Sequence, residues 1–188
     1  MKILAFAGSN STVSINKKLV TFASTFFPED EVEILDLNDF ELPIYKREIE
    51  LENGIPQKAL DFAAKIDNCD LILLSTPENN GNFPAVFKNL MDWISRMKGR
   101  LIFNSKPMFL MATSDGKRGG ASVLEIAVKR FPFDGAEVLE VFSLPKFSEY
   151  FDVEKGIINE EKLAELKEKA AQALGLHDDD LLQARELV

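Results

Sequence analysis

The chain opens on Lys2-Ile-Leu-Ala-Phe-Ala-Gly8, which runs directly into Ser9-Asn-Ser-Thr-Val-Ser14-Ile-Asn16. The first stretch is apolar and predicts a β-strand, and a helical pattern over residues 17–23 follows the polar stretch at once. Small hydroxyl and amide side chains at a helix N-terminus, with its backbone N–H groups, readily bind an anion. We therefore interpret this loop as a candidate phosphate cradle. It matches neither a Walker loop nor a GxGxxG turn, which argues against generic ATPases and Rossmann dehydrogenases.

Short apolar runs alternate with helical patterns along the rest of the chain. Strands are predicted at 2–7, 31–35, 70–75, 108–113 and 137–142, and helices at 14–23, 57–66, 84–97, 120–131 and 160–174. Continuous apolarity, as in Leu71-Ile-Leu-Leu74, is typical of parallel strands covered on both faces. The alternation predicts right-handed crossovers and a doubly wound α/β fold of the flavodoxin-like kind. Its five parallel strands are expected in the order 2-1-3-4-5.

We expect residues 1–175 to form one domain and residues 176–188 to be a polar C-terminal tail or an extra helix. The long, charged connection at 38–56 is interpreted as a surface excursion or a subunit contact.

The composition excludes several function classes. A net charge of −9 disfavours nucleic acid as a partner. The chain has a single cysteine, Cys69, and a single histidine, His177, so we expect no internal disulfide, no metal site built on Cys and His, and no Ser-His-Asp triad. No segment approaches the length of a membrane span. We therefore expect a cytoplasmic protein with no membrane partner.

Polar loops follow the first, third and fourth predicted strands, whose carboxyl ends meet at the point where ligands bind in such sheets. In the first loop, Ser14 can cap the helix, bind a phosphate, or do both. The second loop, 75–84, can border a planar heterocycle or be an ordinary turn. In the third loop, 113–120, Lys117 and Arg118 can meet a phosphate or be a solvated basic turn. One planar, phosphate-bearing ligand would touch all three loops.

At these residues the chain resembles the NAD(P)H-dependent FMN reductase family. The motif G-S-x-R-x-x-S-x-N-x-x-L is present from Gly8 to Leu19, and P-E-Y-N-x-x-x-P-x-x-L-K-N from Pro77 to Asn89. Paired glycines follow Ser114-Asp-Gly116 as in the third motif. The chain departs from the pattern at residues expected to meet the cofactor, because Ser11 replaces an arginine and Asn79 replaces a tyrosine. Both departures are expected to weaken FMN binding or to alter its reactivity.

The resemblance implies FMN as cofactor and NADPH or NADH as co-substrate. It places the FMN phosphate on the first loop and the isoalloxazine along the second and near the third, so the implied cofactor-binding residues are Ser9, Ser11, Ser14, Ile15, Asn16, Pro77, Glu78, Asn79, Asn80, Gly81, Ser114 and Gly116. No catalytic side chain is implied, because the cofactor carries the chemistry. A quinone, dye, metal ion or similar small molecule would accept the electrons. Family members usually pair, which implies a homodimer or homotetramer.

Two rival functions remain open at this stage. A flavodoxin-like electron carrier would bind FMN without oxidising NAD(P)H. A degenerate relative, altered at Ser11 and Asn79, would be a non-catalytic interaction protein. A phosphoacceptor receiver is excluded, because Ala7-Gly8-Ser9 lacks the acidic residues that would hold magnesium at the end of the first strand.

Overall fold

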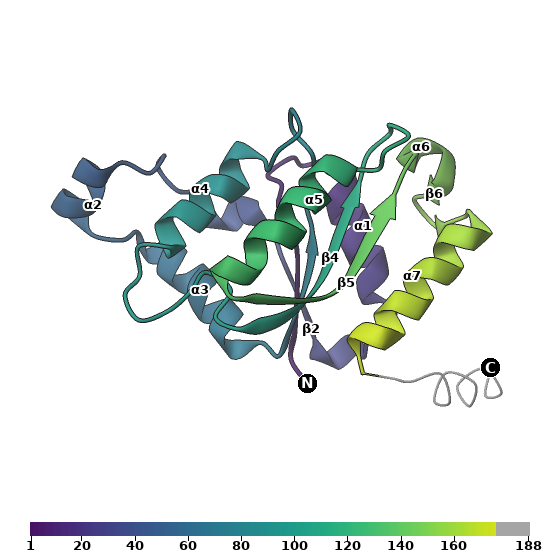
Figure 1. The fold of residues 1–188 in the computed structure, drawn as a ribbon, viewed down its shortest axis with the longest axis horizontal. Coiled ribbons are helices and arrows are strands. Elements are labelled where there is room, and N and C mark those ends of the chain that lie inside the picture. The colour runs from purple at the N-terminus through teal and green to yellow at the C-terminus, as the bar shows by residue number, and fades with distance from the viewer. Residues whose placement is uncertain (176–188) are drawn as a thin grey trace.

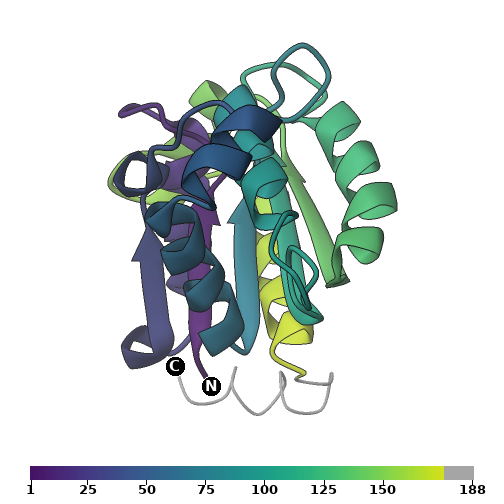
Figure 2. The same cartoon turned by 90° about the vertical axis from the view of Figure 1, so that its left-hand side faces the viewer.

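The computed structural model describes residues 1–175 and is built around a five-stranded parallel sheet (Figure 1). The strand order is β2-β1-β3-β4-β5, so the predicted order is confirmed. Figure 2 shows neighbouring strands pointing the same way, with the loops that follow them gathered at one end of the sheet. The strands are β1 (Ile3–Ala7), β2 (Val32–Leu35), β3 (Leu71–Ser75), β4 (Lys106–Thr113) and β5 (Ala136–Leu144).

Helices cover both faces of the sheet, which explains why the central strands are apolar throughout. In β1, Leu4 and Phe6 belong to the core on one face, while Ile3, Ala5 and Ala7 belong to the core on the other. The first core is covered by α3 (Gln57–Asn68), α4 (Ala85–Ile94) and α5 (Ala121–Arg130). The second is covered by α1 (Ile15–Ser24) and α7 (Glu160–Ala173).

Several short elements lie outside the sequence-based assignment. The connection at 38–56 contains helix α2 (Arg47–Asn53), which protrudes at the left of Figure 1. Helix α6 (Phe147–Tyr150) and a two-stranded hairpin, β6 (Phe151–Asp152) with β7 (Gly156–Ile157), lie between β5 and α7. Single 3₁₀ turns occupy η1 (Glu29–Glu31), η2 (Leu37–Phe40) and η3 (Phe131–Asp134). Pro84, expected in the first turn of a helix, is the N-cap of α4.

The α2 excursion is attached to α4 through Trp93 and Asn89, whose amide accepts from the Tyr45 N–H at 2.7 Å and donates to the Pro43 carbonyl at 3.0 Å. Trp93 is completely buried, and its indole N–H donates to the carbonyl of Pro43 at 2.7 Å. The Tyr45 ring meets the Trp93 ring edge-on, with centroids 5.1 Å apart. These contacts give Trp93 a packing role. On the same helix, Lys88 pairs with Asp92 at 2.5 Å.

Cys69 is buried, and that burial raises the pKa of its thiol to about 11, so it is not an activated nucleophile. No helix within residues 1–175 is long and apolar enough to cross a bilayer. The predicted tail at 176–188 lies outside the described residues.

Candidate functional site

The loops after β1 and β3 border an open cavity of about 370 Å³ at the carboxyl end of the sheet. Most of the residues predicted for the cofactor site line it. The full lining is Ser9, Asn10, Ser11, Val13, Ser14, Ile15, Asn16, Pro77, Glu78, Asn79 and Pro84. The topology explains this meeting, because β1 and β3 are adjacent and the strand order reverses between them.

The first loop presents unused donors to this cavity. The Ser14 hydroxyl oxygen accepts from the backbone N–H of Lys17 at 3.2 Å, so Ser14 is the N-cap of α1. Ser9 accepts in the same way from the Ser11 N–H at 3.2 Å, and Ser11 from the Val13 N–H at 3.3 Å. A serine that accepts through its oxygen still has its O–H to donate. Three hydroxyl donors therefore remain for a ligand.

Backbone donors add to these hydroxyls. Within residues 1–175, no hydrogen bond engages the backbone N–H of Ile15 or Asn16, which open the first turn of α1. The first turn also contains no acidic residue. Hydroxyl donors, unpaired N–H groups and the positive end of a helix dipole are the groups from which proteins build anion sites.

The Asn16 side chain ties three loops together. It is 2% exposed. Its Oδ1 accepts from the Ser75 hydroxyl at 2.8 Å and from the Thr113 N–H at 3.0 Å, and its Nδ2 donates to the Thr113 carbonyl at 3.1 Å. The sequence suggested that this amide could donate to a phosphate, but it is committed to the ends of β3 and β4. The group that Asn16 offers a ligand is its backbone N–H.

The second loop contains a tight turn at its tip. The backbones of Asn79 and Asn82 bond to each other in both directions, at 2.9 and 3.1 Å. Between them Asn80 has φ 52° and Gly81 has φ 76°, the left-handed pair that an Asn-Gly turn favours. A side chain added at Gly81 would meet no atom within 4 Å, and neither Asn80 nor Gly81 lines the cavity.

Glu78 has a structural role that sequence reasoning missed. Helix α5 begins after Gly120, which has no side chain to cap the helix. The Glu78 carboxylate accepts from the backbone N–H of Ser122 at 3.0 Å and of Val123 at 3.3 Å. A residue lining the cavity therefore caps a helix 44 residues away. The spacing between the two segments carries no signal for this contact.

The third loop is held by the segment after β5. The carbonyls of Ser114 and Gly116 accept from the N–H groups of Phe147 and Lys146, each at 3.1 Å. Asp115 accepts from the hydroxyl and backbone N–H of Ser148, and these bonds lower the pKa of Asp115. Ser114 and Gly116 do not line the cavity, but the Asn16 tie places the start of their loop beside it.

The site has little acid–base chemistry of its own. Among its lining residues Glu78 is the single titratable side chain, and its carboxylate lies against α5. Within residues 1–175, no three His, Cys, Asp or Glu side chains are grouped to hold a metal ion. Lys117 and Arg118 form no ion pair with any described residue. The arrangement suits a bound, phosphate-bearing cofactor that brings its own reactivity.

Known proteins that resemble this chain are also reductases. The model of the family described as NADPH-dependent FMN reductase matches residues 1–149. The chain is 29% identical over 179 residues to the NADH:(hydroxy)cinnamate reductase subunit CrdA of Vibrio ruber, a match covering 89% of this chain and 83% of that one. It is 33% identical over 122 residues to the 2-hydroxy-1,4-benzoquinone reductase of a Burkholderia species, covering 64% of each chain.

A solved structure confirms the fold. The flavoenzyme NAD(P)H:(acceptor) oxidoreductase FerB of Paracoccus denitrificans superposes with a TM-score of 0.75 at 23% identity, over 93% of this chain and 95% of that one. The family match spans β1 to β5, and with them the three loops of the candidate site. The chain therefore belongs to the NADPH-dependent FMN reductase family.

Proposed function

We propose that this chain binds FMN in the cavity between the β1 and β3 loops and uses it to pass hydride from NAD(P)H to a small-molecule acceptor. One observation carries the proposal: the hydroxyls of Ser9, Ser11 and Ser14 and the N–H groups of Ile15 and Asn16 gather at the start of α1. These donors would hold the FMN phosphate. When bound, FMN supplies the two-electron chemistry that no side chain of the site offers.

The remaining proposed residues would hold the flavin ring. Pro77, Glu78 and Asn79 form the cavity wall opposite the α1 N-terminus. Asn80 and Gly81 shape the turn beyond them, and Ser114 and Gly116 would approach from the β4 loop. Their role is orientation and exclusion of water. The proposed domain that carries the site is residues 1–175.

The proposed acceptor is a quinone or a similar conjugated molecule, with dyes and metal ions as further candidates. The Burkholderia relative is named as a benzoquinone reductase and the Vibrio relative as a subunit of a hydroxycinnamate reductase, which supports this class. We also propose a homodimer or homotetramer acting in the cytoplasm. The α2 excursion is the candidate contact, because Ile44 and Leu51 are 84% and 72% exposed there.

The experiment is a titration of the purified chain with FMN, followed by steady-state oxidation of NADH and NADPH with 1,4-benzoquinone as acceptor. We expect one FMN per chain and turnover that requires it. An electron carrier would bind FMN without steady NAD(P)H oxidation, and a degenerate relative would do neither. Either result would overturn the proposal. Ser14→Asp, which keeps the helix cap but opposes a phosphate, is the variant that ties binding to this loop.

A further inference from the structure

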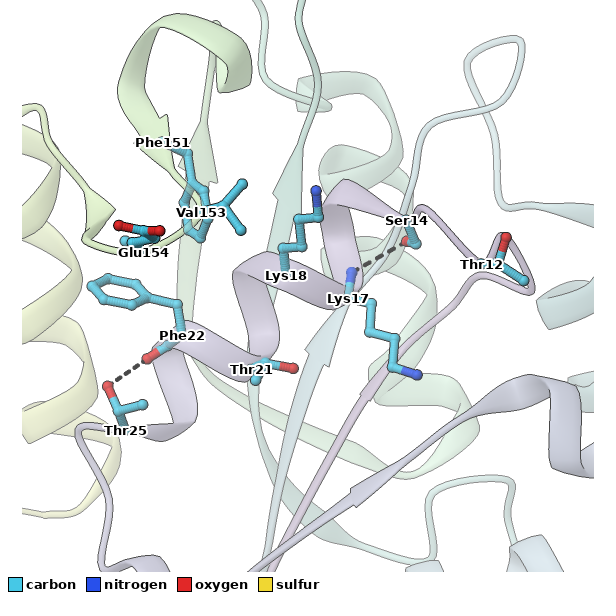
Figure 3. A pocket seen from close by; sticks show the side chains of 11 residues that line it. Thr12, Ser14, Lys17, Lys18, Thr21, Phe22, Thr25, Phe151, Val153 and Glu154 are labelled. Atoms are coloured by element: carbon cyan, nitrogen blue, oxygen red, sulfur yellow. Dashed lines mark hydrogen bonds between the residues drawn. The ribbon is translucent and has the colours of Figure 1, made fainter.

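A second hollow lies on the other side of α1, between that helix and the β6–β7 hairpin (Figure 3). Its volume is about 450 Å³. It shares one lining residue, Ser14, with the cavity described above. This α1 groove, as we call it, lies within the size range of small-molecule sites. Nothing in the proposed flavin chemistry uses it.

One wall of the α1 groove is apolar and aromatic. It consists of Phe22 of α1, Phe151 of β6 and Val153 at the hairpin tip (Figure 3). The Phe22 and Phe151 rings meet edge-on, with centroids 5.8 Å apart. Phe151 also stacks on Phe147 at 4.6 Å. Val153 is 75% exposed, so this wall presents apolar surface to solvent.

The wall is held in place by the hairpin. Asp152 accepts from the N–H groups of Glu154 and Lys155, both at 2.9 Å, which closes the hairpin turn. Gly156 has φ 77°, and its Cα lies so close to the Phe22 ring that a side chain there would overlap it. The groove is therefore a formed feature of the fold.

Positive charge lies beside this apolar wall, on the same helix as Phe22. Helix α1 contains Lys17 and Lys18 and no acidic residue, in a chain whose net charge is −9. Lys17 pairs with Asp36. Lys18 forms no ion pair with any residue from 1 to 175, and Figure 3 shows its side chain between Ser14 and the apolar wall. Glu154 is the acidic residue of the lining.

We propose that the α1 groove binds a small aromatic carboxylate, independently of FMN. Its ring would lie on Phe22, Phe151 and Val153, where edge and face contacts with aromatic rings are favourable. Its carboxylate would pair with Lys18. A single unpaired ammonium, opposed by Glu154, matches a monoanion better than a dianionic phosphate. The proposal commits to this class of ligand because the groove joins one apolar aromatic wall to one unpaired cation.

The test uses 2-naphthoate as the probe and amide NMR as the readout, with the protein both FMN-free and mixed with saturating FMN. We expect saturable shifts at Thr21, Val153 and Gly156, with a Kd of roughly 0.1–1 mM. Shifts confined to Ser9 and Asn79 would mean that the probe enters the other cavity, and no saturable shift would mean that the groove is empty surface. Either outcome overturns the proposal. Because the FMN-free arm stands alone, a failure of FMN binding leaves this test intact.

Three charge variants sharpen the result. Lys18→Gln should weaken 2-naphthoate binding by about two- to fivefold, the effect of losing a partly exposed ion pair. Glu154→Gln should tighten it by about the same factor. Lys155→Gln is the matched control, because it removes the same charge as Lys18→Gln from a hairpin residue that does not line the groove. Equal losses in Lys18→Gln and Lys155→Gln would reduce the effect to general charge and overturn the assignment.

Discussion

Replacing Asn16 with alanine is the sharpest test of how the site is built. The amide makes three hydrogen bonds to Ser75 and Thr113 in a position that is 2% exposed. A typical intramolecular bond contributes about 1 kcal/mol, and a buried partner left unsatisfied costs about 1–3 kcal/mol. We therefore expect Asn16→Ala to lose about 3 kcal/mol of unfolding free energy. Domains are stable by roughly 5–15 kcal/mol, so the variant should still fold.

Urea denaturation of the FMN-free chain, followed by circular dichroism, measures this loss directly. For a chain of this size about 1 kcal/mol shifts Tm by roughly 2–4 °C, so Tm should fall by about 6–12 °C. Asn68→Ala is the control, since exposed Asn68 makes one bond, from its amide to the Ala64 carbonyl at 2.8 Å. It should lose no more than about 0.5 kcal/mol.

A loss below about 1 kcal/mol in Asn16→Ala would refute the reasoning, because it would mean that the three loops hold their positions without the amide. FMN titration adds a second readout. The backbone N–H of residue 16 survives the substitution, so any fall in FMN affinity reports the loosened loops rather than a lost phosphate contact.

Four further outcomes are expected. Ser14→Asp should keep the fold but weaken FMN binding by tenfold or more in a titration, since its charge opposes the phosphate. Glu78→Ala should lose about 1 kcal/mol in urea denaturation, because α5 loses its cap, and Glu78→Gln should recover part of it. Asn79→Tyr should tighten FMN binding by up to about tenfold in calorimetry, because a tyrosine ring can stack on the flavin and asparagine cannot; equal or weaker binding would refute this expectation. Burial raises the pKa of the Cys69 thiol to about 11, whereas the unfolded thiol ionises near pH 8.5. The free energy of unfolding is therefore unaffected by this group below about pH 8.5 and declines as pH rises toward 11. Cys69→Ala should flatten that alkaline loss in denaturation at pH 7 and pH 10.

The sequence predicted the sheet well because the signal is local. Five apolar runs separated by amphipathic helices leave few topologies open, and the expected strand order is the observed one. Helix α2 was missed because Arg47–Asn53 buries none of its residues, so it shows no apolar periodicity. The β6–β7 hairpin was missed because two-residue strands are too short for an alternating pattern.

The sequence predicted most of the residues that line the site but not the hydrogen bonds that connect them. Ser9, Ser14 and Pro77 line one cavity because strand adjacency brings their loops together, which pattern reasoning can anticipate. The bonds of Asn16 to Thr113 and of Glu78 to Ser122 join residues 97 and 44 positions apart. Such pairs follow from side-chain geometry in the folded chain, and neither composition nor periodicity records them.

The Asn16 tie also has a consequence for the order of events during protein synthesis. The first loop leaves the ribosome 59 residues before Ser75 and 97 residues before Thr113. At about 5–20 residues per second, the loop waits roughly 5–20 s for its last partner. A nascent chain that stops before β4 has the serines, the helix start and Ser75, but it lacks Thr113, which makes two of the three bonds of the Asn16 amide. Cofactor capture by ribosome-bound fragments of increasing length should therefore begin only after Thr113 has emerged.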